Sequence, residues 1–230
     1  GCGKVIALCE VRRDRARERA ARAVGVGVIY ALAVKPAADA VGTEQVVCVI
    51  DAVDYAAEVW TAYNERPFVL GIQNGTLEKE KFRFYMIQDY LYLGDYAKIF
   101  ALGVAKATSL SNAMLFSRYI SVMNGELNVH SDYMARLGIT QEDIDSAKRS
   151  LDSLSYTSYM LRVAYEETEV EIVAAILACA YSYEIIAKKM VENNPAAVDD
   201  EFYGSWISGY VSEEYSEENR VLIELLDDMT

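Results

Sequence analysis

The sequence predicts an all-α helical bundle, and three observations support this prediction. Residues that interrupt helices are scarce, since 230 residues contain only three prolines and thirteen glycines. After residue 45, apolar side chains recur at the three-to-four-residue spacing of amphipathic helices. We find no useful length of the alternating apolar and polar pattern that indicates a half-buried strand. The hydrophobic content of 53% is ample for a sizeable core.

The first two predicted helices are separated by proline and glycine. An amphipathic helix is expected over residues 46–63, because the chain reaches Pro67 soon afterwards. Gly75 then makes a turn, and residues 77–107 form a long helix. We expect this long helix to be broken near Met86.

Hydroxyl side chains mark the starts of the next helices. Ser109 or Ser111 can cap a helix that has no breaker until Gly125 and runs on to Leu137. Gly138 suits the C-terminal cap of that helix, and Thr140 begins a short one.

The last part of the chain contains four predicted helices. Thr157 opens the first, and residues 169–193 form the most apolar one, which Pro195 stops. Residues 200–211 and 214–228 supply the last two.

Composition changes near residue 45, which we take as the main boundary. Residues 1–45 contain eight Lys and Arg against five Asp and Glu, whereas the remainder contains fourteen against thirty. The stretch EVRRDRARERAARAV in the first segment indicates a charged helix or a disordered arm. Because the chain begins with Gly1, we expect this segment to be a fragment of an upstream domain, an expression remnant or a misassigned start. It is assigned no function.

Composition also excludes several classes of partner and compartment. A net charge of −13 argues against a nucleic-acid surface, which needs clustered Lys and Arg. No run of eighteen uncharged apolar residues occurs after residue 45, and the first segment lacks the pattern of a signal peptide, so neither a membrane span nor export is predicted. The four cysteines lack the spacing of structural zinc sites, which favours a reduced cytoplasmic protein.

A metal site is the familiar alternative for a helical bundle. The di-iron carboxylate bundle needs two Glu-x-x-His units, whereas this chain has one histidine, His130, four residues after Glu126. We therefore predict no metal site, and we expect His130 to have a structural hydrogen-bonding role.

Two segments place reactive side chains on one side of a helix. Asp89, Tyr92 and Tyr96 share one face of a helix, and Cys179 and Tyr183 lie four apart in the run EIVAAILACAYSYEII. An unpaired carboxylate is costly to bury in such an apolar helix, so Asp89 is either paired or faces a cavity. These groups predict a pocket for a small polar aromatic molecule. A cysteine in an apolar helix is more often a small buried hydrophobic residue, and residue types alone leave that alternative open.

The same segments resemble a known family. The stretches FRFYMIQDYLYLGDYAKIF, SYTSYM, AAILACAYSYEIIAKKM and FYGSWISGY follow the order and spacing of TenA-type proteins, and residues 46–230 resemble the cysteine class of this thiaminase II, or aminopyrimidine aminohydrolase, family. The resemblance implies a haem-oxygenase-like (TenA-type) all-α bundle that forms a homotetramer and needs no cofactor. It also implies hydrolysis of thiamin or its aminopyrimidine breakdown products to a hydroxymethylpyrimidine.

The resemblance assigns roles to six residues. Cys179 matches the nucleophile, and Asp89 matches the residue that binds the ring nitrogen and exocyclic amine of the aminopyrimidine. Tyr92 and Tyr183 match walls that contact the ring. Tyr156 and Tyr210 match hydrogen-bonding groups near the reacting carbon, and we count them with Cys179 as catalytic.

One departure from the family pattern keeps two other functions open. The family normally ends with a further helix whose Tyr-Glu motif supplies the proton shuttle, and this chain stops at Thr230, where that helix is expected to begin. We therefore expect residues 46–230 to lack it. The alternatives are an aminopyrimidine-binding relative without turnover and a structural or regulatory helical protein.

Overall fold

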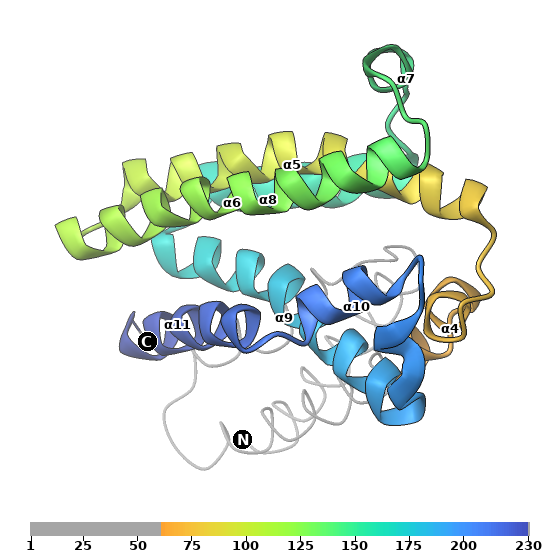
Figure 1. Cartoon of the computed structure of the whole chain (residues 1–230). Coiled ribbons are helices and arrows are strands. Elements are labelled where there is room, and N and C mark those ends of the chain that lie inside the picture. The colour runs from red at the N-terminus through yellow and green to blue at the C-terminus, as the bar shows by residue number, and fades with distance from the viewer. Residues whose placement is uncertain (1–60, 230) are drawn as a thin grey trace, which may run out of the picture.

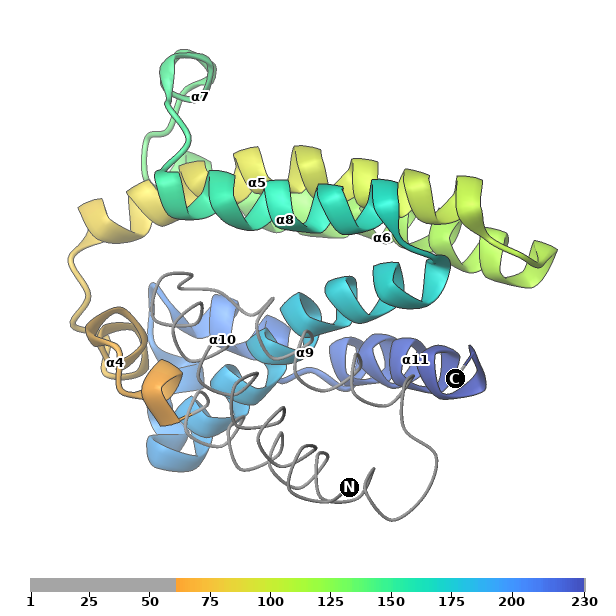
Figure 2. The same cartoon turned by 180° about the vertical axis from the view of Figure 1, so that it is seen from behind.

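The computed structural model describes residues 61–229, apart from the side chains of residues 124–129, 227 and 229. Within this range every regular element is a helix, which confirms the predicted all-α class (Figures 1 and 2). The Arg-rich segment of residues 1–45 lies outside the described residues. So does most of the helix predicted over residues 46–63, although residues 61–64 are helical.

Three helices form one layer of the bundle (Figure 1). The long α5 (Lys79–Lys106) packs along α6 (Leu110–Arg136) and along α8 (Leu151–Glu166). The short α7 (Gln141–Ser146) projects from one end of this layer in both views (Figure 2). α5 therefore carries side chains that meet two neighbours within its own layer.

The second layer is built around the most apolar helix. α9 (Glu169–Asn193) packs against α11 (Glu213–Met229), α10 (Gly204–Tyr210), α4 (Pro67–Gln73) and the 3-10 turn η1 (Pro195–Asp199). It also contacts α5 and α8 in the other layer. Among the described helices, α9 is the one with the length and apolar composition of a membrane span, and half of its most apolar window is buried inside the bundle. Its composition thus has an explanation in core packing.

Several predicted helix ends are confirmed by their hydrogen bonds. Ser109 caps α6 by accepting from the backbone N–H of Asn112 at 3.0 Å. Thr140 and Asp143 form a capping box at α7, and Gly138 has a φ of +62° after α6. The predicted bounds of α9 agree with the structure.

Other predicted ends are wrong. α5 is unbroken at Met86, which has no helix-breaking neighbour and packs into the core. Thr157 lies inside α8, because Ser150 caps that helix one residue before Leu151. The final region has a 3-10 turn before α10, so α10 begins at Gly204 rather than at residue 200.

The core has two parts that meet along α5. One cluster contains Leu93, Tyr96 and Phe100 from the C-terminal half of α5. The other contains Phe82 and Met86 from its N-terminal half. The polar residues Asp89 and Tyr92 therefore fall at the junction between the two clusters.

Candidate active site

A cavity of about 540 Å³ lies between the two layers at this junction. Its walls come from α5, α6, α9, α10 and α11. Five of the six predicted site residues line it: Asp89, Tyr92, Cys179, Tyr183 and Tyr210. The size suits a drug-sized or smaller organic molecule.

Asp89 is the charged centre of one end of the cavity. Its Oδ2 lies 2.8 Å from Nε2 of His130, and the Tyr85 hydroxyl donates to the same atom at 3.3 Å. Trp206 Nε1 in turn donates to the Tyr85 oxygen at 3.3 Å, and that hydroxyl is 3.4 Å from the hydroxyl of Tyr183. Because these bonds meet at Oδ2, the other carboxylate oxygen is left to meet a ligand.

Two phenols beside Asp89 are held in their neutral form. Burial raises the pKa of Tyr85 well above its usual range, and the charge of Asp89 raises it further. Burial and Asp89 have the same effect on the pKa of Tyr183. Both hydroxyls can therefore donate hydrogen bonds at neutral pH.

Cys179 is the sulfur group of the cavity. It lies on α9, is buried, and takes part in no disulfide. The Tyr92 hydroxyl donates to its Sγ at 3.1 Å, a bond that favours a thiolate. Tyr63 is also close, since burial first and then Cys179 raise the pKa of that phenol to about 12.

Aromatic rings from α9, α10 and α11 form one wall of the cavity. The ring centroids of Tyr183 and Tyr210 are 4.7 Å apart, and the planes differ by 30°. Trp206 meets Tyr210 edge-on at 4.8 Å, as Tyr215 does at 5.0 Å. Such a wall can stack on a flat heteroaromatic ring.

Tyr156 is the predicted residue that does not line the cavity. It lies behind Tyr92, with ring centroids 6.0 Å apart and an interplanar angle of 7°. Its buried hydroxyl forms no hydrogen bond of standard geometry with the described residues, but it is close enough to Cys179 to interact with the sulfur. Burial and the nearby Cys179 raise the pKa of Tyr156 well above its usual range, so the group remains protonated.

The cavity bears more negative than positive groups. Asp89, Glu214 and Glu218 are its carboxylates, His130 is its single ring base, and none of the described lining residues is Lys or Arg. The site therefore suits neutral or cationic ligands rather than anions. Among the residues whose side chains the structure describes, no group of three or more His, Cys, Asp or Glu is arranged to hold a metal ion.

Three residues near the site were missed by the sequence analysis, namely Tyr63, Tyr85 and Trp206. Tyr85 precedes Asp89 by one helical turn, a spacing that could have revealed it. His130 was expected to have a hydrogen-bonding role, but its partner is distant in the sequence. No sequence pattern indicated Trp206 or Tyr63.

Comparison with known proteins now adds to this geometry. The sequence profile of the TENA/THI-4/PQQC family matches residues 37–230. The chain belongs to this family. The matched region begins at residue 37, which precedes the change in composition near residue 45.

Two curated relatives are named aminopyrimidine aminohydrolase. The relative from Halalkalibacterium halodurans is 43% identical over 174 residues, which cover 75% of this chain and 77% of the relative. The relative from Helicobacter pylori is 44% identical over 176 residues, with coverage of 76% and 81%.

Solved structures of the family share the fold. The TenA homologue from P. horikoshii superposes with a TM-score of 0.68 at 28% identity, covering 75% of this chain and 80% of the homologue. This similarity confirms the TenA-type bundle.

Proposed function

We propose that the protein hydrolyses thiamin or aminopyrimidines derived from it, releasing a hydroxymethylpyrimidine. The observation that carries the proposal is the joint placement of the Asp89–His130 pair and the Cys179 sulfur on one aromatic-walled cavity. The names of the two relatives at 43% and 44% identity support the same substrate class. Thiamin salvage is the process that such a reaction serves.

Asp89 is proposed to bind the pyrimidine edge. A carboxylate can accept one hydrogen bond from a protonated ring nitrogen and another from the exocyclic amine. His130 holds the carboxylate in place, because it bonds to Oδ2 from the neighbouring helix α6. Tyr183 contacts the ring from one side, and Tyr92 does so from the other.

Cys179 is proposed as the nucleophile. Its thiolate adds to the electron-poor ring, and the ring nitrogen held by Asp89 receives the electron pair. The amine, once it has taken up a proton, or the already cationic thiazolium of thiamin then leaves the exocyclic carbon with its bonding electrons as a neutral molecule. Water adds to that carbon and loses a proton, after which the thiolate leaves the ring to give the alcohol.

Phenols are the proposed proton carriers in these steps. Tyr92 donates to Sγ, and Tyr210 lines the cavity at the aromatic wall. Tyr156 stacks on the Tyr92 ring, and its hydroxyl is close enough to Cys179 to exchange a proton with the sulfur. General acid–base catalysis of this kind contributes about 10²–10⁴ in rate.

The decisive experiment is hydrolysis of 4-amino-5-aminomethyl-2-methylpyrimidine by the purified protein. Cys179→Ala is expected to abolish turnover and to retain binding in calorimetry. Asp89→Asn is expected to weaken binding about tenfold to a hundredfold, the value of a charge-assisted hydrogen bond. Binding without turnover in the parent protein would favour the aminopyrimidine-binding alternative, and the absence of binding would leave a structural or regulatory protein.

The finer properties are also proposals. We propose a homotetramer, supported by exposed apolar side chains such as Phe84, Met114 and Leu151, which light scattering after gel filtration would test. A cytoplasmic location is proposed because a cysteine nucleophile needs a reducing compartment, and cell fractionation would test this. Comparing kcat/KM for thiamin and the free aminopyrimidine would establish the preferred substrate.

A further inference from the structure

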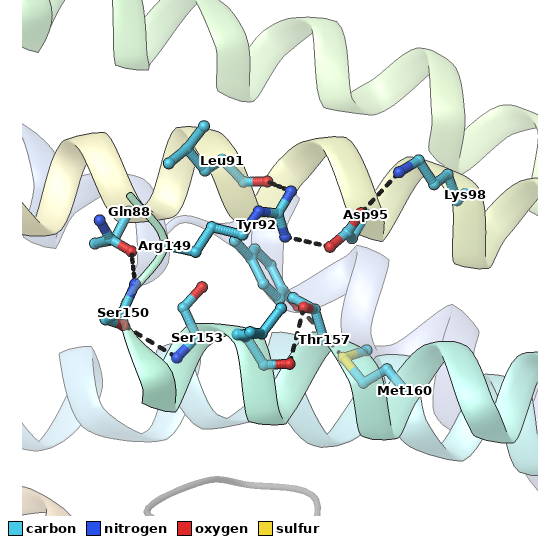
Figure 3. A network of polar contacts seen from close by, with 11 residues as sticks. Gln88, Leu91, Tyr92, Asp95, Lys98, Arg149, Ser150, Ser153, Thr157 and Met160 are labelled. Carbon is cyan, nitrogen blue, oxygen red and sulfur yellow. Dashed lines mark hydrogen bonds and ion pairs between the residues drawn. The ribbon is translucent and has the colours of Figure 1, made fainter. Parts of the chain in front are cut away.

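The connection between α7 and α8 is tied to α5 by the side chain of Gln88 (Figure 3). Gln88 Nε2 donates to the backbone carbonyl of Lys148 at 3.0 Å. Its Oε1 accepts from the backbone N–H of Ser150 at 2.7 Å. The residue that caps α8 is therefore itself held by α5.

Arg149 makes the second tie between the same segments. Its guanidinium donates to the backbone carbonyl of Leu91 at 2.9 Å and forms an ion pair with Asp95 (Figure 3). Lys98 also pairs with Asp95, at 2.8 Å, but from within α5. Burial raises the pKa of Asp95, whereas Lys98 and Arg149 together outweigh burial and lower it, so the carboxylate is charged at neutral pH.

These ties are the main constraint on the start of α8. Leu151 and Leu154 in its first turn are 80% and 47% exposed, so they add little packing. The first fully buried residue of the helix is Thr157. A helix end with so little burial is held in place chiefly by its polar contacts.

α8 in turn supplies the support for Tyr92. Tyr156 stacks on the Tyr92 ring, and Met160 Sδ lies 3.8 Å from the Tyr92 hydroxyl. That hydroxyl is 3.1 Å from the sulfur of Cys179. The Tyr156 hydroxyl also interacts with Cys179, so the α8 backbone and the stacking on Tyr92 determine where this hydroxyl lies relative to the sulfur.

Two neighbouring faces of α5 thus have different contacts, one with the α7–α8 connection and one with the cavity. Gln88, Leu91 and Asp95 face the α7–α8 connection, and each is followed in the sequence by a residue that lines the cavity. The start of α8 is attached to the helix that carries Tyr92, within one turn of that residue.

We propose that Arg149 is a positioning residue for the nucleophile: by fastening the start of α8 to Leu91 and Asp95, it fixes Tyr156 and Tyr92 against the Cys179 sulfur. This inference rests on the proposed function. No α8 residue is among the described residues that line the cavity, so the fastening reaches the substrate only through Tyr92 and acts mainly on the chemical step.

The test compares Arg149→Met with Lys98→Met, since each removes one cation from the same carboxylate. Arg149→Met is expected to lower kcat about 10–100-fold, because a displacement of about 1 Å can cost that much, while KM changes by less than about threefold. Lys98→Met leaves both constants near those of the parent. Arg149→Lys restores part of kcat, because one ammonium can reach one of the two acceptors.

Alkylation of Cys179 by iodoacetamide, followed by mass spectrometry of its peptide, gives a readout independent of turnover. Loss of the Tyr92 hydrogen bond is expected to slow alkylation about two- to tenfold in Arg149→Met and to leave Lys98→Met unchanged. Equal effects of both variants, or a raised KM with kcat retained, would overturn the proposal.

Failure of the proposed function is distinguishable from failure of this inference. If the parent protein does not turn over the aminopyrimidine, the proposed function fails, and the alkylation rates still decide the role of Arg149. If Arg149→Met does not fold, Arg149→Lys enters the same comparison with Lys98→Met. An alkylation rate for Arg149→Lys equal to that of the parent would then overturn the proposal.

Discussion

Replacement of His130 tests how strongly the cavity holds its charged centre. Nε2 of His130 lies 2.8 Å from Oδ2 of Asp89, and the two side chains are only 7% and 13% exposed. Breaking a buried pair by removing one partner costs about 3–5 kcal/mol, because the other polar group is left buried. His130→Ala is expected to lower the free energy of unfolding by that amount. Tyr85 cannot replace the lost hydrogen bond, because its hydroxyl already donates to the same oxygen at 3.3 Å.

A double-mutant cycle isolates the interaction from the loss of the imidazole ring. His130→Ala, Asp89→Ala and the double variant are unfolded in urea at one fixed protein concentration. We expect a coupling free energy of about 1.5–3 kcal/mol, the contribution of a hydrogen bond to a charged group. Tyr85→Phe is the control and should cost about 0.5–1.5 kcal/mol. A coupling below about 0.5 kcal/mol, the level of independent sites, would refute the reasoning.

Three further predictions concern the core around the site. Tyr156→Phe removes a buried hydroxyl that forms no hydrogen bond of standard geometry with the described residues, so the free energy of unfolding should rise by about 1 kcal/mol in denaturant titrations while kcat falls. Gly103→Ala places a Cβ 2.4 Å from the Phe116 ring and should destabilise by about 1–3 kcal/mol, whereas Gly94→Ala meets nothing within 4 Å and should stabilise by up to about 1 kcal/mol; thermal melts that rank them otherwise would contradict the packing. The pKa of Asp95 is lowered in the folded protein, so its charged form stabilises the fold at pH values above the ordinary carboxyl pKa of 3.8. This contribution is lost as the pH falls through the lowered pKa. The free energy of unfolding should therefore decline less steeply with acid in Asp95→Asn than in the parent.

Helix boundaries were predictable wherever a local signal existed. Thr140 and Gly138 act within a few residues of the ends they mark, and Pro195 stops α9 for the same local reason. The start of α8 was not predictable in this way, because several serines and threonines precede apolar residues there. Ser150 was selected by the hydrogen bond that its backbone N–H donates to Gln88, which is 62 residues away in the sequence.

The candidate site divides along the same line. Helical spacing indicated that Asp89 and Tyr92 share a face, and the apolar surroundings of Asp89 indicated a partner or a cavity. Neither signal could name His130, because it lies 41 residues away on another helix. The position of Tyr156 behind Tyr92, rather than in the cavity, likewise depends on how α8 packs on α5.

The sequence by itself determined that this chain is all helical, which helix faces are apolar, and to which family its motifs belong. These properties follow from local spacing and residue type, which a linear pattern records. Only the tertiary structure decided which polar groups meet: the carboxylate with the imidazole, the phenol with the thiol, and the arginine with the neighbouring helix. Such contacts join residues far apart in the chain, and their distances depend on how the helices pack against one another.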